Sequence, residues 1–131
     1  RQDEVLAVSD VAHMNGLDAL LAYVRAHFEA MGARPDLRAY FSLLASAVAD
    51  LSDIRAAFAQ SHERVKRLLT EFVVRGKGEG VISKAANPEA VALMVGSALM
   101  GAAMQALIDP GFDAAPVRDE TLRTLRAGLA A

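Results

Sequence analysis

Apolar residues recur along most of the chain at intervals of three and four, the spacing that places side chains on one face of an α-helix. No stretch alternates apolar and polar residues for long enough to predict a β-strand. The apolar stripes predict six helices, over about residues 1–12, 17–31, 35–49, 54–75, 88–108 and 116–129. We therefore expect an all-α fold, a helical bundle of about six helices in one domain over residues 1–131.

Helix-breaking residues separate these predicted helices. Asn15-Gly16 follows the first helix, and the glycines between residues 76 and 80 stop the fourth. Asn87 is a predicted N-cap, with Pro88 at the first helical position after it. The glycine run lacks the Gly-Lys-Ser/Thr of a phosphate-binding loop, so we interpret it as a helix stop. The basic residues between positions 55 and 84 are most simply the solvated face of the fourth helix.

The fifth predicted helix contains no charged residue between Ala90 and Ile108. A helix that is apolar all round is buried on nearly every side. It is therefore either the central helix of the domain, or it packs one face on its own domain and the other on a partner chain. A membrane span is the alternative, because about 20 apolar residues cross a bilayer. Alanine and glycine dominate the stretch, Ser97 and Gln105 interrupt it, and neither basic clusters nor Trp or Tyr flank it, so we expect no membrane partner.

Composition and charge narrow the class of protein. The 131 residues are 53% hydrophobic, which is enough for a packed core, and the 14 basic and 16 acidic residues leave a net charge of −2. Because nucleic-acid modules usually carry a basic excess, DNA binding by this chain itself is disfavoured. Without cysteine the chain forms neither disulfides nor thiolate zinc sites, and it is compatible with the reducing cytoplasm, where we expect it. The charged start, without a signal peptide or an initiator Met, indicates part of a longer protein or a processed chain.

One set of residues carries a family resemblance across nearly the whole chain. A long helix ends in a glycine-punctuated turn, a short link leads to an Asn-Pro-Glu helix start, and an uncharged helix follows. This order resembles the C-terminal region of TetR-type transcriptional regulators. The residues concerned are Leu68, Leu69, Phe72, Gly76, Glu79-Gly80-Val81-Ile82, Asn87-Pro88-Glu89-Ala90-Val91 and Gly101.

The resemblance implies a regulatory function. In TetR-type regulators the body binds a small, often apolar effector between helices that correspond to the second to fifth predicted here. The last two helices pair with those of a second subunit in a four-helix dimer interface. A helix-turn-helix head, which is absent from this chain, reads the operator, and the first predicted helix resembles the end of the helix that joins head to body. Effector binding moves that helix and weakens DNA binding, which requires different effector affinities in the two states.

The effector site is predicted where the stripes of the second to fifth helices converge and carry scattered polar atoms. His27 is either a satisfied core histidine or a group at the pocket edge, and His62 and Tyr40 lie either in the pocket or at the surface. Ser61 needs a partner, which is a ligand, a water or a helix carbonyl, and Met94 fills either core or pocket. No histidine is followed by His, Asp or Glu after three or four residues, so neither a metal site nor a cofactor is predicted. The predicted lining residues are Val24, His27, Tyr40, Phe41, Phe58, Ser61, His62 and Met94.

A homodimer is predicted through the fifth and sixth helices. Small residues in the fifth helix allow another backbone to approach closely, and leucines at helical spacing in the sixth form a second apolar stripe. The predicted interface residues are Val95, Ala98, Leu99, Gly101, Ala102, Gln105, Leu122, Leu125 and Leu129.

The preferred function is therefore the effector-sensing part of a transcriptional repressor, which contacts DNA only through the absent head. A helical dimerisation module without ligand, and a helical carrier or enzyme that shares the bundle, are the alternatives. No Ser-His-Asp or paired-carboxylate arrangement is identifiable in the sequence, so nothing positive supports an enzyme.

Overall fold

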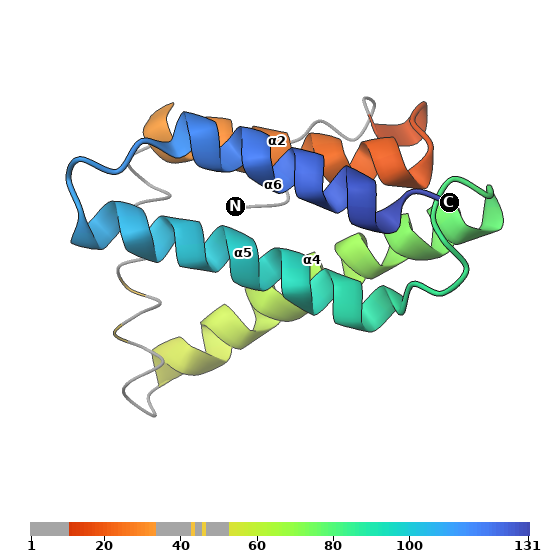
Figure 1. Cartoon of the computed structure of the whole chain (residues 1–131). Helices are drawn as coiled ribbons and strands as arrows, with labels where there is room; N and C mark the ends of the chain where they lie inside the picture. Colours follow the sequence, from red (N-terminus) through yellow and green to blue (C-terminus); the bar gives the residue numbers. More distant parts are fainter. Residues whose placement is uncertain (1–10, 34–42, 44–45, 47–52) are drawn as a thin grey trace.

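The computed structural model describes residues 11–33, 43, 46 and 53–131, and within them the fold is all-α (Figure 1). The four helices of this part are α2 (Gly16–Ala33), α4 (Asp53–Gly78), α5 (Pro88–Ile108) and α6 (Ala114–Leu129). They correspond to the second, fourth, fifth and sixth predicted helices. The first predicted helix is described only at Val11 and Ala12, which are helical. The third lies almost wholly outside the described residues.

α2 is the helix around which the others are arranged. It packs along both α4 and α6, and α4 packs in turn along α5. α5 and α6 run beside each other in Figure 1 but make few direct contacts. The two C-terminal helices are therefore each held by α2 or α4 more than by one another.

Both C-terminal helices begin at side-chain caps. The Asn87 side chain accepts a hydrogen bond from the backbone N–H of Ala90 at 3.1 Å, and Pro88 stands at the start of the helix. Proline suits that position because its missing N–H has no partner within the helix. Asp113 caps α6 in the same way and accepts from the N–H of Ala115. The Asn-Pro start that the sequence predicts for α5 is thereby confirmed.

The end of α4 is tied to the end of α6. α4 continues two residues past Gly76, where we expected it to stop, and Gly80 turns the chain with a φ of 77°, which glycine adopts without strain. The Gly76 carbonyl accepts from the N–H groups of Val81 and Ile82, both at 3.0 Å. Ile82 is fully buried against Gly76 and forms an antiparallel bridge with Ala130.

The core combines one face of each described helix with the loop residue Ile82. Its largest fully buried side chains are Tyr23, Leu20, Leu69, Ile82, Leu99, His27, Val24, Val73 and Val95. α6 contributes Leu122, Leu125 and Leu129. Among the described residues, His27 and Ser61 are buried polar members of this core.

α5 is not the central helix of the bundle. Only 33% of its apolar span is buried within the chain, and its buried residues form the single stripe Val91, Ala92, Val95, Leu99, Ala102 and Ala103. By length and composition α5 is the one helix of the described part that is long and apolar enough to cross a membrane. The described residues therefore bury one face of α5 and leave its other face uncovered.

Candidate functional site

The outward face of α5 is an uninterrupted uncharged surface, which we call the α5 face. It consists of Ala90, Leu93, Met94, Ser97, Ala98, Gly101, Gln105 and Ile108, all exposed and mostly three or four residues apart. Leu93, Met94 and Ile108 expose 45%, 50% and 78% of their surface. Soluble monomers seldom expose so continuous an apolar surface, and such patches mark interaction sites.

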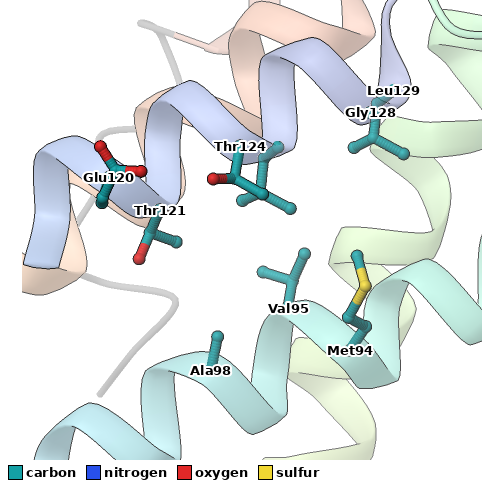
Figure 2. A pocket seen from close by; sticks show the side chains of 9 residues that line it. Met94, Val95, Ala98, Glu120, Thr121, Thr124, Gly128 and Leu129 are labelled. Carbon is teal, nitrogen blue, oxygen red and sulfur yellow. The ribbon is translucent and has the colours of Figure 1, made fainter.

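A groove runs between the α5 face and α6 (Figure 2). Its volume is about 530 Å³. α5 supplies Met94, Val95 and Ala98, and α6 supplies Glu120, Thr121, Thr124, Leu125, Gly128 and Leu129. In Figure 2 the side chains of Val95 and Ala98 point towards α6 across open space. Ala98 and Gly128 are the smallest of these residues and place little side-chain volume in the groove.

Several polar side chains at or beside the groove are already bonded within their own helices. The Ser97 hydroxyl donates to the Leu93 carbonyl at 2.7 Å, and the Thr121 hydroxyl donates to a carbonyl one turn back in α6, also at 2.7 Å. Such bonds leave a hydroxyl with little need for an outside partner. Glu120 is paired with Arg123 on the exposed side of α6, and this hydrogen bond holds the pKa of Glu120 below its ordinary value. The surface therefore behaves as an apolar one with a charged rim.

The predicted interface residues fall into two groups. Ala98, Gly101 and Gln105 lie on the α5 face. The others are buried in the chain's own core, and of these Val95, Leu125 and Leu129 also line the groove, whereas Leu99, Ala102 and Leu122 do not. Helical periodicity identifies positions that something buries, but not whether the chain itself or a second molecule does so. The set predicted from the sequence does not include Leu93, Ser97, Ile108, Thr121, Thr124 and Gly128. The first three were within reach of the helical pattern, because they lie three, four or eight residues from the predicted Gly101 or Gln105.

The predicted effector residues are also dispersed. Val24 and His27 are buried on α2, Ser61 is buried on α4, and Phe58 is half-buried. His62 is exposed and borders a shallow cleft of about 30 Å³ between α4 and α5, which is far smaller than a typical ligand pocket. Met94 lies on the α5 face instead of the interior. Tyr40 and Phe41 lie outside the described residues.

The structure adds Tyr23 to the buried polar groups of α2. Tyr23 and His27 are each 1% exposed, and a separation of four residues places them on one face of the helix. Burial lowers the pKa of His27 from 6.5 to about 4, because a dry environment disfavours the charged imidazolium. At neutral pH His27 is therefore an uncharged ring that can donate one hydrogen bond and accept another. The i, i+4 pairing of these two rings is the sequence signal that identifies Tyr23.

Comparison with known proteins gives one match. The family model described as BetI-type transcriptional repressor, C-terminal, matches residues 16–131. The match begins at the first residue of α2 and includes all four described helices. No curated protein and no solved structure matches the chain. The family is one of transcription regulators and not of enzymes, and the resemblance to TetR-type regulators is confirmed. The chain belongs to the family of C-terminal domains of BetI-type transcriptional repressors, a branch of the TetR regulators.

Proposed function

We propose that this chain is the regulatory part of a cytoplasmic repressor, in which it dimerises and binds a small, mostly apolar effector. DNA contacts belong to a separate helix-turn-helix head, since the chain carries a net charge of −2. The observation that carries the proposal is the uncharged α5 face beside an open groove. Family membership supports the regulatory role.

The dimer is proposed to form by apposition of two copies of the α5 face. In a twofold interface each subunit contributes the same surface patch. The patch must therefore contain both protruding side chains and a recess that receives the protruding side chains of the other copy. Leu93, Met94 and Ile108 supply exposed apolar side chains, and the groove between α5 and α6 supplies the recess. Gly101 and Ala98 leave room for two helices to approach closely. With α6 at the flank, the two copies make a four-helix arrangement.

Ala98→Arg tests this interface, because it places a long charged side chain at the wall of the groove. An unpaired charge in a closed apolar seam costs several kcal/mol, so we expect the dimer dissociation constant to rise about 100-fold or more. Ala59→Arg is the matched control, since Ala59 is exposed on α4 and does not line the groove. Sedimentation velocity over a concentration series reads out both variants. A monomeric wild-type chain at micromolar concentration, or an A98R variant that dimerises as the wild type does, contradicts the proposed interface.

The effector is proposed to bind against the inner face of α2. Support comes from two polar rings, Tyr23 and His27, buried among apolar side chains, with the buried Ser61 on the packed neighbour α4. A few polar groups set in an apolar environment are what orients small molecules in their sites. Neutral His27 suits an uncharged ligand because it demands no counter-ion.

A thermal-shift screen of small apolar compounds tests effector binding, with native mass spectrometry to identify any molecule that copurifies. For a compound that raises the unfolding temperature, His27→Phe keeps the ring volume but removes both nitrogen atoms. We expect its dissociation constant to rise about tenfold, as for the loss of one buried hydrogen bond. His13→Phe is the control, because His13 is exposed before α2. If no compound binds, the chain is a dimerisation module without ligand. If H27F binds as well as the wild type, the site lies elsewhere.

A further inference from the structure

The turn that leads into α2 is held by the C-terminal end of α4. One guanidinium nitrogen of Arg75, Nη2, donates to the carbonyl oxygens of Val11 at 3.2 Å and Met14 at 3.0 Å. Four residues further on, the Glu79 carboxylate accepts from the backbone N–H of Gly16 at 2.7 Å. In each of these three hydrogen bonds, the donor and the acceptor are more than 60 residues apart in the sequence. Arg75 in the last turns of α4 and Glu79 just after this helix therefore bind the turn between Val11 and Gly16 at both of its ends.

The signs of the two charges match the ends of the helices that they touch. Val11 and Ala12 are the last helical residues before the turn, so their end of the helix presents free carbonyl groups, and α2 begins at Gly16 with free N–H groups. A cation is favourable at the carbonyl end of a helix and an anion at the amide end. Arg75 and Glu79 place each charge at the end that it stabilises.

Arg75 is also held firmly in its own position. Its guanidinium carbon lies 5.6 Å from the centre of the Phe72 ring, one turn earlier in α4. Among the described residues its Nε atom is buried and has no hydrogen-bond partner, so this part of the half-buried side chain is shielded from water. A fixed cation with two carbonyl acceptors positions the turn more closely than a mobile surface lysine could.

The backbones of α2 and α4 meet at the same place. A Cβ atom on Gly16 would lie 2.2 Å from the Phe72 carbonyl oxygen and 2.3 Å from the Gly76 nitrogen. Two backbones in direct contact leave no side-chain layer in which one helix can slide over the other. The Asn15 side chain completes the junction by accepting from the N–H of Asp18 at 2.8 Å.

We propose that Arg75 and Glu79 form a latch that makes the chain entering at Val11 move as one body with the C-terminal turn of α4. α4 packs against both α2, where the effector is proposed to bind, and α5, which carries the proposed dimer face. A displacement of α4 produced at either place is therefore delivered to Val11, the point at which the described body meets the chain that precedes it. Arg75 is a positioning residue in this scheme, and its regulatory meaning rests on the proposed function. The latch itself does not depend on an effector, a partner or DNA.

Hydrogen exchange measured by mass spectrometry on the 131-residue chain tests the latch without any ligand. The amides of Met14, Gly16 and Asp18 are hydrogen-bonded in the turn and report on its opening. In Arg75→Met, which keeps the length of the side chain but removes its donors, we expect their exchange to accelerate about tenfold. Amides in the middle of α5 and α6 should exchange as in the wild type. Arg75→Lys should recover part of the protection, because it restores a cation at the helix end.

Two further variants separate a latch from general loosening. Arg123→Gln removes an exposed guanidinium that pairs with Glu120 on α6, and it should leave the turn unchanged. Glu79→Gln weakens the hydrogen bond between Glu79 and the Gly16 N–H, at an exposed residue. In the double variant with Arg75→Met, the exchange rate of the turn amides should rise by less than the product of the two single increases, because either substitution alone releases the same turn. Unchanged exchange of the turn in both R75M and E79Q overturns the proposal. An acceleration that extends equally through α5 and α6 also overturns it.

Discussion

Acidification should destabilise this domain through His27. Burial lowers the pKa of His27 to about 4, whereas in the unfolded chain the ring titrates at its ordinary value of 6.5. Between these values the unfolded state binds a proton that the folded state does not, so stability falls as the pH falls. The contribution of neutral His27 to the free energy of unfolding is fully present above about pH 6.5 and is lost as the pH falls to about 4. Because each pKa unit corresponds to about 1.4 kcal/mol, the loss amounts to about 3 kcal/mol, a large part of the stability of a small domain.

Urea unfolding at a series of pH values from 7.5 to about 4 measures this effect. His27→Phe serves as the reference because it keeps a buried ring but cannot be protonated. Every other titrating group, including the exposed His13 and His62, is shared by the two proteins, so the difference between their free energies of unfolding isolates His27. All samples need one protein concentration, since association stabilises the folded state. We expect the difference to change by about 3 kcal/mol in favour of H27F as the pH falls. A difference that stays constant from pH 6.5 to 4.5 would refute the inference that His27 is buried and neutral.

Three substitutions test the packing by urea or thermal unfolding. Gly16→Ala forces a methyl group to within 2.2 Å of the Phe72 carbonyl oxygen and should destabilise the domain by about 3 kcal/mol or more; a stable G16A variant means that α2 and α4 are not in backbone contact. Ile82→Ala empties a fully buried site and should cost about 2–5 kcal/mol, whereas a loss below 1 kcal/mol argues that the loop is not part of the core. Asn87→Ala removes the cap on Ala90 N–H and should cost about 1 kcal/mol, with no effect expected if the start of α5 is held by packing alone.

The features that were predictable from the sequence are local ones. Apolar periodicity located the four described helices to within a few residues, because a helix repeats its burial every three to four positions. The Asn87 cap was predictable since its chemistry involves only the next three residues. The burial of His27 follows in the same way from its position beside an apolar stripe on α2, whereas its role as a core residue or a pocket residue stays a prediction.

Features that depend on distant parts of the chain were not predictable in this way. The sequence pattern predicts Arg75 on the solvated face of a long helix, but the structure places it half-buried against carbonyl groups about 60 residues earlier in the chain. No periodic pattern encodes which remote groups a charge will meet. Leu122 shows the second limit: its stripe was correctly identified as buried, but it faces the chain's own core. Amphipathic patterning indicates that one face of a helix is buried, but it does not tell whether the chain itself or a second molecule buries it.

The character of the α5 face favours a protein partner over lipid. α5 is long and apolar enough, by length and composition, to cross a membrane. However, its neighbour α6 carries the exposed Glu120–Arg123 pair beside the groove, and a bilayer around α5 would have to accommodate those charges as well. The inward stripe of α5 is already packed on the rest of the bundle. The outward one includes Gln105, Ala98 and Gly101, small or polar residues that gain little from lipid but allow another helix to approach closely. In the proposed dimer, the exposed Leu93 and Met94 of one copy would enter the groove of the other, and the small residues Ala98 and Gly101 would let the two helices approach closely.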